Sequence, residues 1–310
     1  MYPVFDVSKS ISDRPEALGT KEKFWLIPDA PSGLPASPHL FKIGRPQTGE
    51  NWAEKVCCEI LGHVEISQSH LSLCCPRRRY GSSLRTLHAA GGSFIPANMI
   101  IAQTVPDYDG ERRFRQFKYQ LSTSLGMLRV MLTVRPPLAT PDKYAHLTAA
   151  DFLVGYLLFD TLVGNTDRHH ENWGVVIVPG NGASAPPTFH LAPSFDHASS
   201  LGRNETDASR VRRLTTTDKR DSVEAYAMRS RTAFYGHADA TRTLTQSELI
   251  CELRGAYPAS TTFWATIFSA IDSEVFGSIF ARISPELMSR DAARFALRIA
   301  VLNPDSAIPR

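Results

Sequence analysis

"GNTDRHHENWGVV", residues 164–176, and "SFDHASSLG", residues 194–202, are the most informative stretches of this chain. The first holds two histidines, two carboxylates and two asparagines between apolar runs. Such a concentration of acid, base and amide groups fits a metal-ligand cluster, a phosphoryl-transfer loop or a polar turn without chemistry. The spacing of the residues separates these three interpretations.

The histidines argue against a zinc site. His169 and His170 are neighbours, whose side chains point in divergent directions on a helix or a strand, and the H-E-x-x-H pattern is absent from the sequence. A polar turn that leaves a buried helix explains Gly164 and Asn165, but it does not explain why acid, base and amide groups concentrate there. Phosphoryl transfer therefore accounts for more of this stretch than either alternative.

The spacing of the carboxylates and the amide suits phosphoryl transfer. Asp167 and Asn172 form the pattern D-x-x-x-x-N, which is the interval between the base and the metal-binding asparagine of the protein-kinase catalytic loop. A second metal carboxylate is expected beyond a short hairpin, and Asp196 stands at that position. The run "WGVVIVPGNGASAPPTFHLAP", residues 173–193, predicts this hairpin.

These residues resemble a known family. "NTDRHHENWG" followed by "LAPSFDHASSLG" resembles the HipA-like serine/threonine kinases, and D-R-H-x-x-N is also similar to the catalytic loop of phosphatidylinositol kinases. The HipA-like resemblance is closer, since "LAPSFD" matches that family's usual L-A-P-x-Y-D segment. It implies an α+β, bilobal protein-kinase-like fold with a small N-terminal β-sheet lobe and a mostly helical C-terminal lobe. It also implies that Asp167 is the catalytic base, and that Asn172 and Asp196 are the Mg²⁺ ligands.

The resemblance extends upstream into the part of the chain that would bind ATP. "LGTKEKFWL", residues 18–26, looks like the family's phosphate-loop pattern G-x-Q-x-K, and "HLFKIGR", residues 39–45, looks like the strand with the nucleotide lysine. By this resemblance Lys42 contacts the α- and β-phosphates, and Glu54 on the next helix is its ion-pair partner. Backbone N–H groups and ammonium ions near the phosphates would come from Gly19, Thr20, Lys21 and Lys23.

Two further residues of the catalytic loop have roles that the sequence leaves open. His169 is a candidate catalytic residue that orients Asp167 or, when charged, binds a phosphate; a structural hydrogen bond is the alternative. Arg168 is expected to reach a phosphorylated residue or a carboxylate. The adenine-contacting hinge is expected near residues 95–103.

The composition is that of a soluble globular protein. The 310 residues are 43% hydrophobic, and 34 Lys and Arg against 31 Asp and Glu leave a formal charge of only +3, which predicts no polyanion partner. The five cysteines lack CxxC spacing and are expected to be reduced thiols. No signal peptide and no run of about 20 apolar residues is present, so a cytoplasmic location without a membrane partner is predicted.

The periodicity of apolar residues outlines the elements. We expect strands in "KFWLIPD" and "HLFKIGR", a helix over residues 51–61 that stops at Gly62, and a second helix over residues 112–128. The clearest helix begins at Thr148, where T-x-x-D resembles a capping box and "FLVGYLLFDTLV" is apolar nearly all round.

The remainder of the chain is expected to be helical or irregular. Residues 203–245 are interpreted as a mobile segment or as short surface helices, and further helices are expected within residues 260–280 and from Met288 onward. The arginine-rich stretches "CCPRRRY" and "ASRVRRL" are interpreted as solvated surface, without direct nucleic-acid binding. The predicted lobes are residues 1–103 and 104–310.

We therefore expect an ATP- and Mg²⁺-dependent kinase that phosphorylates a Ser or Thr hydroxyl of a protein, itself included. Two alternatives stay open at this point. One is a nucleotide-binding interaction protein, either a pseudokinase or the partner of a small DNA-binding antitoxin, as HipA-like toxins often are. The other is a phosphatidylinositol-type lipid kinase, for which the sequence shows no basic amphipathic helix.

Overall fold

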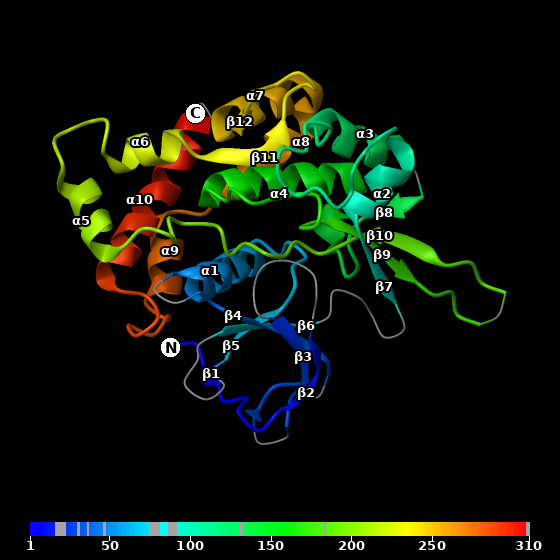
Figure 1. Cartoon of the computed structure of the whole chain (residues 1–310), viewed down its shortest axis with the longest axis horizontal. Helices are drawn as coiled ribbons and strands as arrows, with labels where there is room; N and C mark the ends of the chain where they lie inside the picture. Colours follow the sequence, from blue (N-terminus) through cyan, green and yellow to red (C-terminus); the bar gives the residue numbers. More distant parts are fainter. Residues whose placement is uncertain are drawn as a thin grey trace.

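A curled, six-stranded sheet forms the N-terminal part of the chain, with one helix packed on it (Figure 1). The structure is a computed structural model that describes all residues except 16–22, 30–31, 36, 46–47, 75–80, 86–91, 131–132, 183 and 308–310. The strand order is β1-β5-β6-β4-β3-β2, and every pairing is antiparallel except that of β1 with β5. The strands are β1 Val4–Phe5, β2 Ile11–Pro15, β3 Lys23–Ile27, β4 His39–Ile43, β5 Leu71–Cys74 and β6 Gly81–Arg85.

The two faces of this sheet have different partners. Successive side chains of a strand point to opposite faces, so Phe41 and Lys42 of β4 diverge. Phe41 is buried in a small apolar cluster with Leu26 and Cys74. Lys42 is buried toward α1, Glu50–His63, which lies between the sheet and the helical region (Figure 1). A lysine at a buried sheet position needs paired charges around it. The candidate site is therefore expected around Lys42.

A second sheet connects the two parts of the chain. It consists of β7 Ser93–Pro96, β8 Val134–Arg135, β9 Gly174–Val178 and β10 Thr188–Leu191, in the order β7-β9-β10-β8. Strands β9 and β10 form the hairpin expected beyond Asn172. Strand β7 follows the first sheet in the chain and pairs with β9, which begins directly after residues 164–173. This pairing connects the two parts of the chain. A two-stranded sheet, β11 Arg231–Tyr235 and β12 Thr243–Thr245, follows later.

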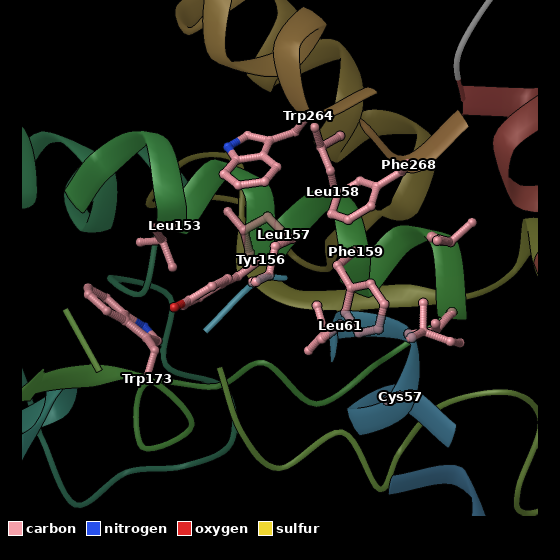
Figure 2. Close-up of a cluster of buried hydrophobic side chains, with 14 of the residues drawn as sticks. Cys57, Leu61, Leu153, Tyr156, Leu157, Leu158, Phe159, Trp173, Trp264 and Phe268 are labelled. Atoms are coloured by element: carbon pink, nitrogen blue, oxygen red, sulfur yellow. The ribbon is translucent and has the colours of Figure 1, made fainter. Parts of the chain in front are cut away.

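Helices make up most of the C-terminal part, and α4 lies at their centre. Every residue of α4, Ala149–Val163, is buried except Asp151, and Thr148 forms the predicted capping box with Asp151. Figure 2 shows Tyr156 and Phe159 of this helix among aromatic side chains from several elements. The other helices are α2 Ala97–Thr104, α3 Leu121–Val130, the 3₁₀ turn Asp142–Tyr144, α5 Asp207–Thr215, α6 Val223–Met228, α7 Gln246–Ala256, α8 Pro258–Ser269, α9 Ser273–Phe280 and α10 Arg290–Ala307.

The predicted fold class is confirmed: a β-sheet region precedes a helical region. Two details of the element prediction were wrong. Gly62 does not stop the first helix, which continues to His63. The helix expected over residues 112–128 begins only at Leu121, because residues 105–120 form turns. Residues 203–245 contain the expected short helices but also a hairpin. The lobe boundary at residue 103 stays a prediction.

The stretch "ASRVRRL" is not uniformly solvated. Arg210 is buried, donates to Asp207 at 2.7 Å, and lies 5.9 Å from the Trp52 ring of α1. Its alkyl stem and charge therefore help to hold α5 against α1. In "CCPRRRY", residues 75–80 lie outside the described residues. In the described part of the chain no helix has the length and apolar character that crossing a membrane would need.

A substitution at Gly155 of α4 tests how tightly this helix packs against α8. A Cβ at this position would lie 2.6 Å from Trp264, which is fully buried. Gly155→Ala should lower the free energy of unfolding by about 1–3 kcal/mol, because overpacking outweighs the helix propensity of alanine. Gly126→Ala in α3 is the matched control, since its Cβ would meet nothing within 4 Å and should be neutral or stabilising. Urea unfolding of both variants checks the difference; equal effects would contradict it.

Candidate active site

Lys42 is the centre of a buried charge cluster. Its Nζ lies 3.5 Å from Glu54 Oε1 and 3.2 Å from Asp196 Oδ1, and the lysine is only 4% exposed. Burial by itself lowers the pKa of Lys42, but the charges of Asp196 and Glu54 outweigh that effect and the pKa is raised. The lysine is therefore a permanent cation between two carboxylates that lie 142 positions apart in the sequence.

The first sheet and α1 hold this lysine in place. Lys42 stands directly opposite Ser82 on one neighbouring strand and opposite Lys23 on the other. Directly opposite residues share a face of an antiparallel sheet, so all three side chains face α1. Ser82 Oγ donates to Glu54 Oε2 at 2.9 Å, which fixes the carboxylate that faces Lys42.

The start of α1 is tied to the segment that follows Asp196. Glu50 is buried and forms ion pairs with the Arg203 guanidinium and, at 3.4 Å, with Arg45. The amide of Gly49 also donates to the Arg203 carbonyl at 2.9 Å. The helix that carries Glu54 is thus attached directly to Arg203, in the segment that follows Asp196.

Asp196 follows β10 in an unusual backbone conformation. Its φ of 57° lies in the left-handed region, which aspartate tolerates better than most residues. The next residue, His197, is buried and lies with its Nε2 2.8 Å from Ser194 Oγ. This tight turn aims the Asp196 carboxylate at Lys42, away from the core.

Arg168 holds the loop of residues 164–173 and the turn of residues 194–197 together. It makes a bidentate pair with Asp160 of α4, at 2.7 and 2.8 Å, and both side chains are almost fully buried. Its Nη1 donates to the carbonyls of Asn172 at 2.8 Å and Phe195 at 3.0 Å. The two residues expected to bind metal, Asn172 and Asp196, are therefore fixed by one guanidinium. Of the two roles expected for Arg168, the structure shows the carboxylate partner.

Hydrogen bonds shape the loop around Asp167. Gly164 ends α4 in the left-handed conformation, and Asn165 then donates to Asp160 Oδ1 at 2.8 Å while accepting from the Asp167 amide at 3.1 Å. Asn172 Nδ2 donates to the Asp167 carbonyl at 2.6 Å. The Asp167 carboxylate remains more than a third exposed, at the surface of the loop.

Arg113 is a neighbour of Asp167 that the sequence prediction missed. Its guanidinium lies 3.1 Å from Asp167 Oδ2. It comes from the turns of residues 105–120, where the sequence pattern predicted a helix. The only available signal was the basic run "ERRFRQFK", residues 111–118. The structure thus adds a cation beside the expected base.

His169 is a neutral imidazole. Burial, reinforced by the charge of Arg113, lowers its pKa to about 3. Its Nδ1 accepts from the Glu171 amide at 3.1 Å, and its Nε2 lies 3.9 Å from Asp167 Oδ1. A cationic His169 that binds phosphate near neutral pH is therefore disfavoured. The hydrogen bond that stood as the structural alternative is present.

The donor set fits magnesium better than zinc. Among the described residues no group of three or more His, Cys, Asp and Glu could hold a metal ion. A Mg²⁺ bound between nucleotide phosphates needs only one or two carboxylates or amide oxygens, the rest coming from phosphate and water. The side chains of Asn172 and Asp196 offer one amide oxygen and one carboxylate. They would hold such an ion beside Lys42.

The structure brings together most of the residues singled out from the sequence, although their roles stay predictions. Lys42, Glu54 and Asp196 form the charge cluster, while Asp167, His169 and Asn172 form the loop. Lys23 shares the face of Lys42. Gly19, Thr20 and Lys21 lie outside the described residues. Besides Arg113, sequence reasoning missed the supporting residues Ser82, Asp160 and Arg203.

The fold around this site is similar to that of solved kinase structures. No family model and no curated protein sequence matches the chain. Among solved structures, the chain is similar to the Helicobacter pylori proinflammatory kinase CtkA, with a TM-score of 0.73 and 16% identity over 99% of this chain and 96% of that one. The chain thus has a kinase-like fold.

A second similar structure is HipA from Shewanella oneidensis MR-1, described in a complex of the HipA–HipB toxin–antitoxin system with its operator DNA. The TM-score is 0.54 and the identity 12%, over 95% of this chain and 64% of HipA. The chain therefore spans just under two thirds of the length of this neighbour. At such low sequence identities the structural similarity shows the fold alone.

The Asp160–Arg168 pair should be essential for stability. Arg168→Met leaves the Asp160 carboxylate buried without its cation and should cost about 3–5 kcal/mol of unfolding free energy. The double variant Asp160→Leu/Arg168→Met removes both charges and should recover part of that loss. Urea denaturation of the wild type, Arg168→Met and the double variant measures the difference. A double variant no more stable than Arg168→Met would refute this account.

The buried histidines predict a stability loss in mild acid. Burial lowers the pKa of His170 to about 4 and that of His197 well below 6.5, as for His169. In the unfolded chain these groups titrate near 6.5, so unfolding takes up protons below that pH. Their stabilisation is fully present above pH 6.5 and is lost as the pH falls, by up to about 1.4 kcal/mol per histidine per pH unit.

Chemical denaturation at pH 7, 6 and 5 measures this loss. Ordinary carboxylates stay ionised over that range and contribute little to the slope. His197→Gln removes one of the three groups and should flatten the dependence by about a third. A stability that is constant from pH 7 to 5 would show that the imidazoles are not buried as neutral groups.

Proposed function

We propose that this protein is an ATP-dependent kinase that transfers the γ-phosphate to a Ser or Thr hydroxyl of a protein. The observation that carries the proposal is the position of Lys42 between Glu54 and Asp196, at 3.5 and 3.2 Å. A buried lysine held by a helix carboxylate and a metal-loop carboxylate is the arrangement that positions nucleotide phosphates in protein kinases. The kinase-like fold supports the same conclusion.

Each residue of the site has a task in this proposal. Lys42, fixed by Glu54, contacts the α- and β-phosphates, and Lys23 on the adjacent strand adds positive charge on the same face. Asn172 and Asp196 would hold a magnesium ion, which would supply neutralisation of the phosphate charge when bound. The ion pair of Asp196 with Lys42 keeps both charges compensated.

Asp167 orients the acceptor hydroxyl and accepts its proton. Its partial exposure leaves the carboxylate accessible to a protein side chain, while Asn165 and Asn172 fix the loop around it. Arg113, which faces Asp167 in this structure, places a cation where negative charge accumulates during transfer. Positioning and electrostatics supply the rate, as they do in phosphoryl transfer generally.

A partner protein remains part of the proposal. The structural neighbour HipA is described with HipB and operator DNA, and by analogy a small DNA-binding antitoxin is a candidate partner for this chain. The acceptor protein is a second partner, and the chain itself is one candidate acceptor. A pseudokinase is the alternative, but the presence of all three side chains, Asp167, Asn172 and Asp196, speaks against it.

Radiolabel transfer from ATP tests the proposal directly. Asp167→Asn should reduce transfer by about 10²- to 10⁴-fold while leaving nucleotide affinity unchanged. Asp196→Asn should reduce both, because asparagine keeps the left-handed backbone at this position but removes the metal carboxylate. Asp239→Asn, on an exposed loop, is the control and should behave as wild type. An Asp167→Asn protein with full activity would overturn the assignment of the base.

A further inference from the structure

A cavity of about 380 Å³ lies beside the catalytic loop. Thr166, which directly precedes Asp167, lines it together with Ser199 from the segment after Asp196. The Thr166 amide donates to the Ser199 carbonyl at 3.4 Å, so these two segments meet at the cavity wall. The end of α6, the start of β11 and Ile299 of α10 complete the lining. The cavity therefore borders the chain that carries the proposed base.

The lining of this cavity carries only positive charge. Arg203, Arg229 and Arg231 belong to it, whereas none of its described lining residues is Asp or Glu. The chain as a whole is nearly balanced, with 34 basic against 31 acidic residues. Arg203 is paired with Glu50, which leaves Arg229 and Arg231 as the cationic groups that face solvent at the cavity.

Two of the arginines keep their full charge at the rim. Arg229 and Arg231 are exposed, and their guanidinium groups donate to backbone carbonyls, those of Arg220 and Thr243. Carbonyl oxygens hold a guanidinium in position but do not neutralise it. Each guanidinium retains further N–H donors, which match the planar geometry of a carboxylate or a phosphate.

The inner part of the cavity contains donors without partners. Arg203 is 7% exposed; its Nη1 pairs with Glu50 and its Nη2 with Ser199, but its Nε has no hydrogen-bond partner among the described residues. The same holds for Ser230 Oγ, which also lines the cavity. Buried donors are rarely left unpaired in folded proteins, because losing their hydration is unfavourable. Both atoms expose almost no surface, so they add to the polar character of the cavity wall but do not open into the cavity.

We propose that this cavity binds an anionic side chain of the acceptor protein, a carboxylate or a phosphate, next to the hydroxyl that is phosphorylated. The proposal rests on the kinase function proposed above and adds a substrate class to it: acidic or already phosphorylated Ser/Thr segments. The volume suffices for a side chain of this size. The exposed guanidinium groups of Arg229 and Arg231 contact the anion at the rim of the cavity.

Binding without ATP tests the cavity independently of catalysis. The probes are the peptides Gly-Gly-X-Gly-Gly, with X as phosphoserine, glutamate or serine, and inorganic phosphate, each titrated by calorimetry. The phosphoserine and glutamate peptides should bind wild type, and Arg229→Ala/Arg231→Ala should weaken them at least about tenfold. The charge-matched control Arg290→Ala/Arg294→Ala, on exposed positions of α10, should bind as wild type. Binding of inorganic phosphate without either anionic peptide would overturn the acceptor proposal.

Specificity in turnover provides the second test. A positional library of Ser/Thr peptides with radiolabelled ATP should show a preference of about tenfold or more for Asp, Glu or phosphoserine at one fixed offset from the acceptor. Arg229→Glu/Arg231→Glu should replace it by a preference for Lys or Arg at the same offset, a gain that misfolding cannot produce. Transfer without any anion preference would refute the substrate class while sparing the kinase function. Anionic peptides that bind through Arg229 and Arg231 but are never phosphorylated would refute the kinase function while leaving the anion-binding cavity in place.

Discussion

The bidentate contact between Arg168 and Asp160 is the interaction on which the candidate site depends. A single guanidinium in the interior is compensated by a carboxylate of the central helix, and its remaining donors reach the carbonyls of Asn172 and Phe195. Each carbonyl precedes or belongs to a residue expected to hold magnesium. Because burying a guanidinium without its full set of acceptors is strongly unfavourable, the two loops have one low-energy arrangement relative to α4.

The burial of Lys42 in the first sheet is a second constraint on the candidate site. Lys42 tolerates its buried position only because Glu54 and Asp196 approach it from two directions, one on α1 and the other on the turn after β10. The sheet, the helix and the turn are therefore positioned by one electrostatic cluster. The same cluster suits a nucleotide, since phosphate oxygens and a divalent cation can replace the carboxylate–lysine contact with interactions of the same sign.

The sequence predicted which side chains lie close together better than it predicted the residues that support them. The D-x-x-x-x-N spacing and the later aspartate identified side chains that lie in one region of the structure, because the residues of a short loop stay together in any fold. Glu54 could be placed only through the family resemblance, and Ser82 and Asp160 not at all, since their contacts join segments far apart in the chain. The sequence did not predict Arg113 as a site residue, because an apolar 3.6-residue period suggested a helix where the chain forms turns.

The contact of α1 with Arg203 has a consequence for how this protein can be regulated. In protein kinases the position of the corresponding helix controls whether its glutamate pairs with the nucleotide lysine. Here the same helix is anchored at its first turn to the chain beyond Asp196, through a buried ion pair and a backbone hydrogen bond. Withdrawing Glu54 would require breaking that anchor, which costs several kcal/mol. The helix is therefore held in the position that pairs Glu54 with Lys42.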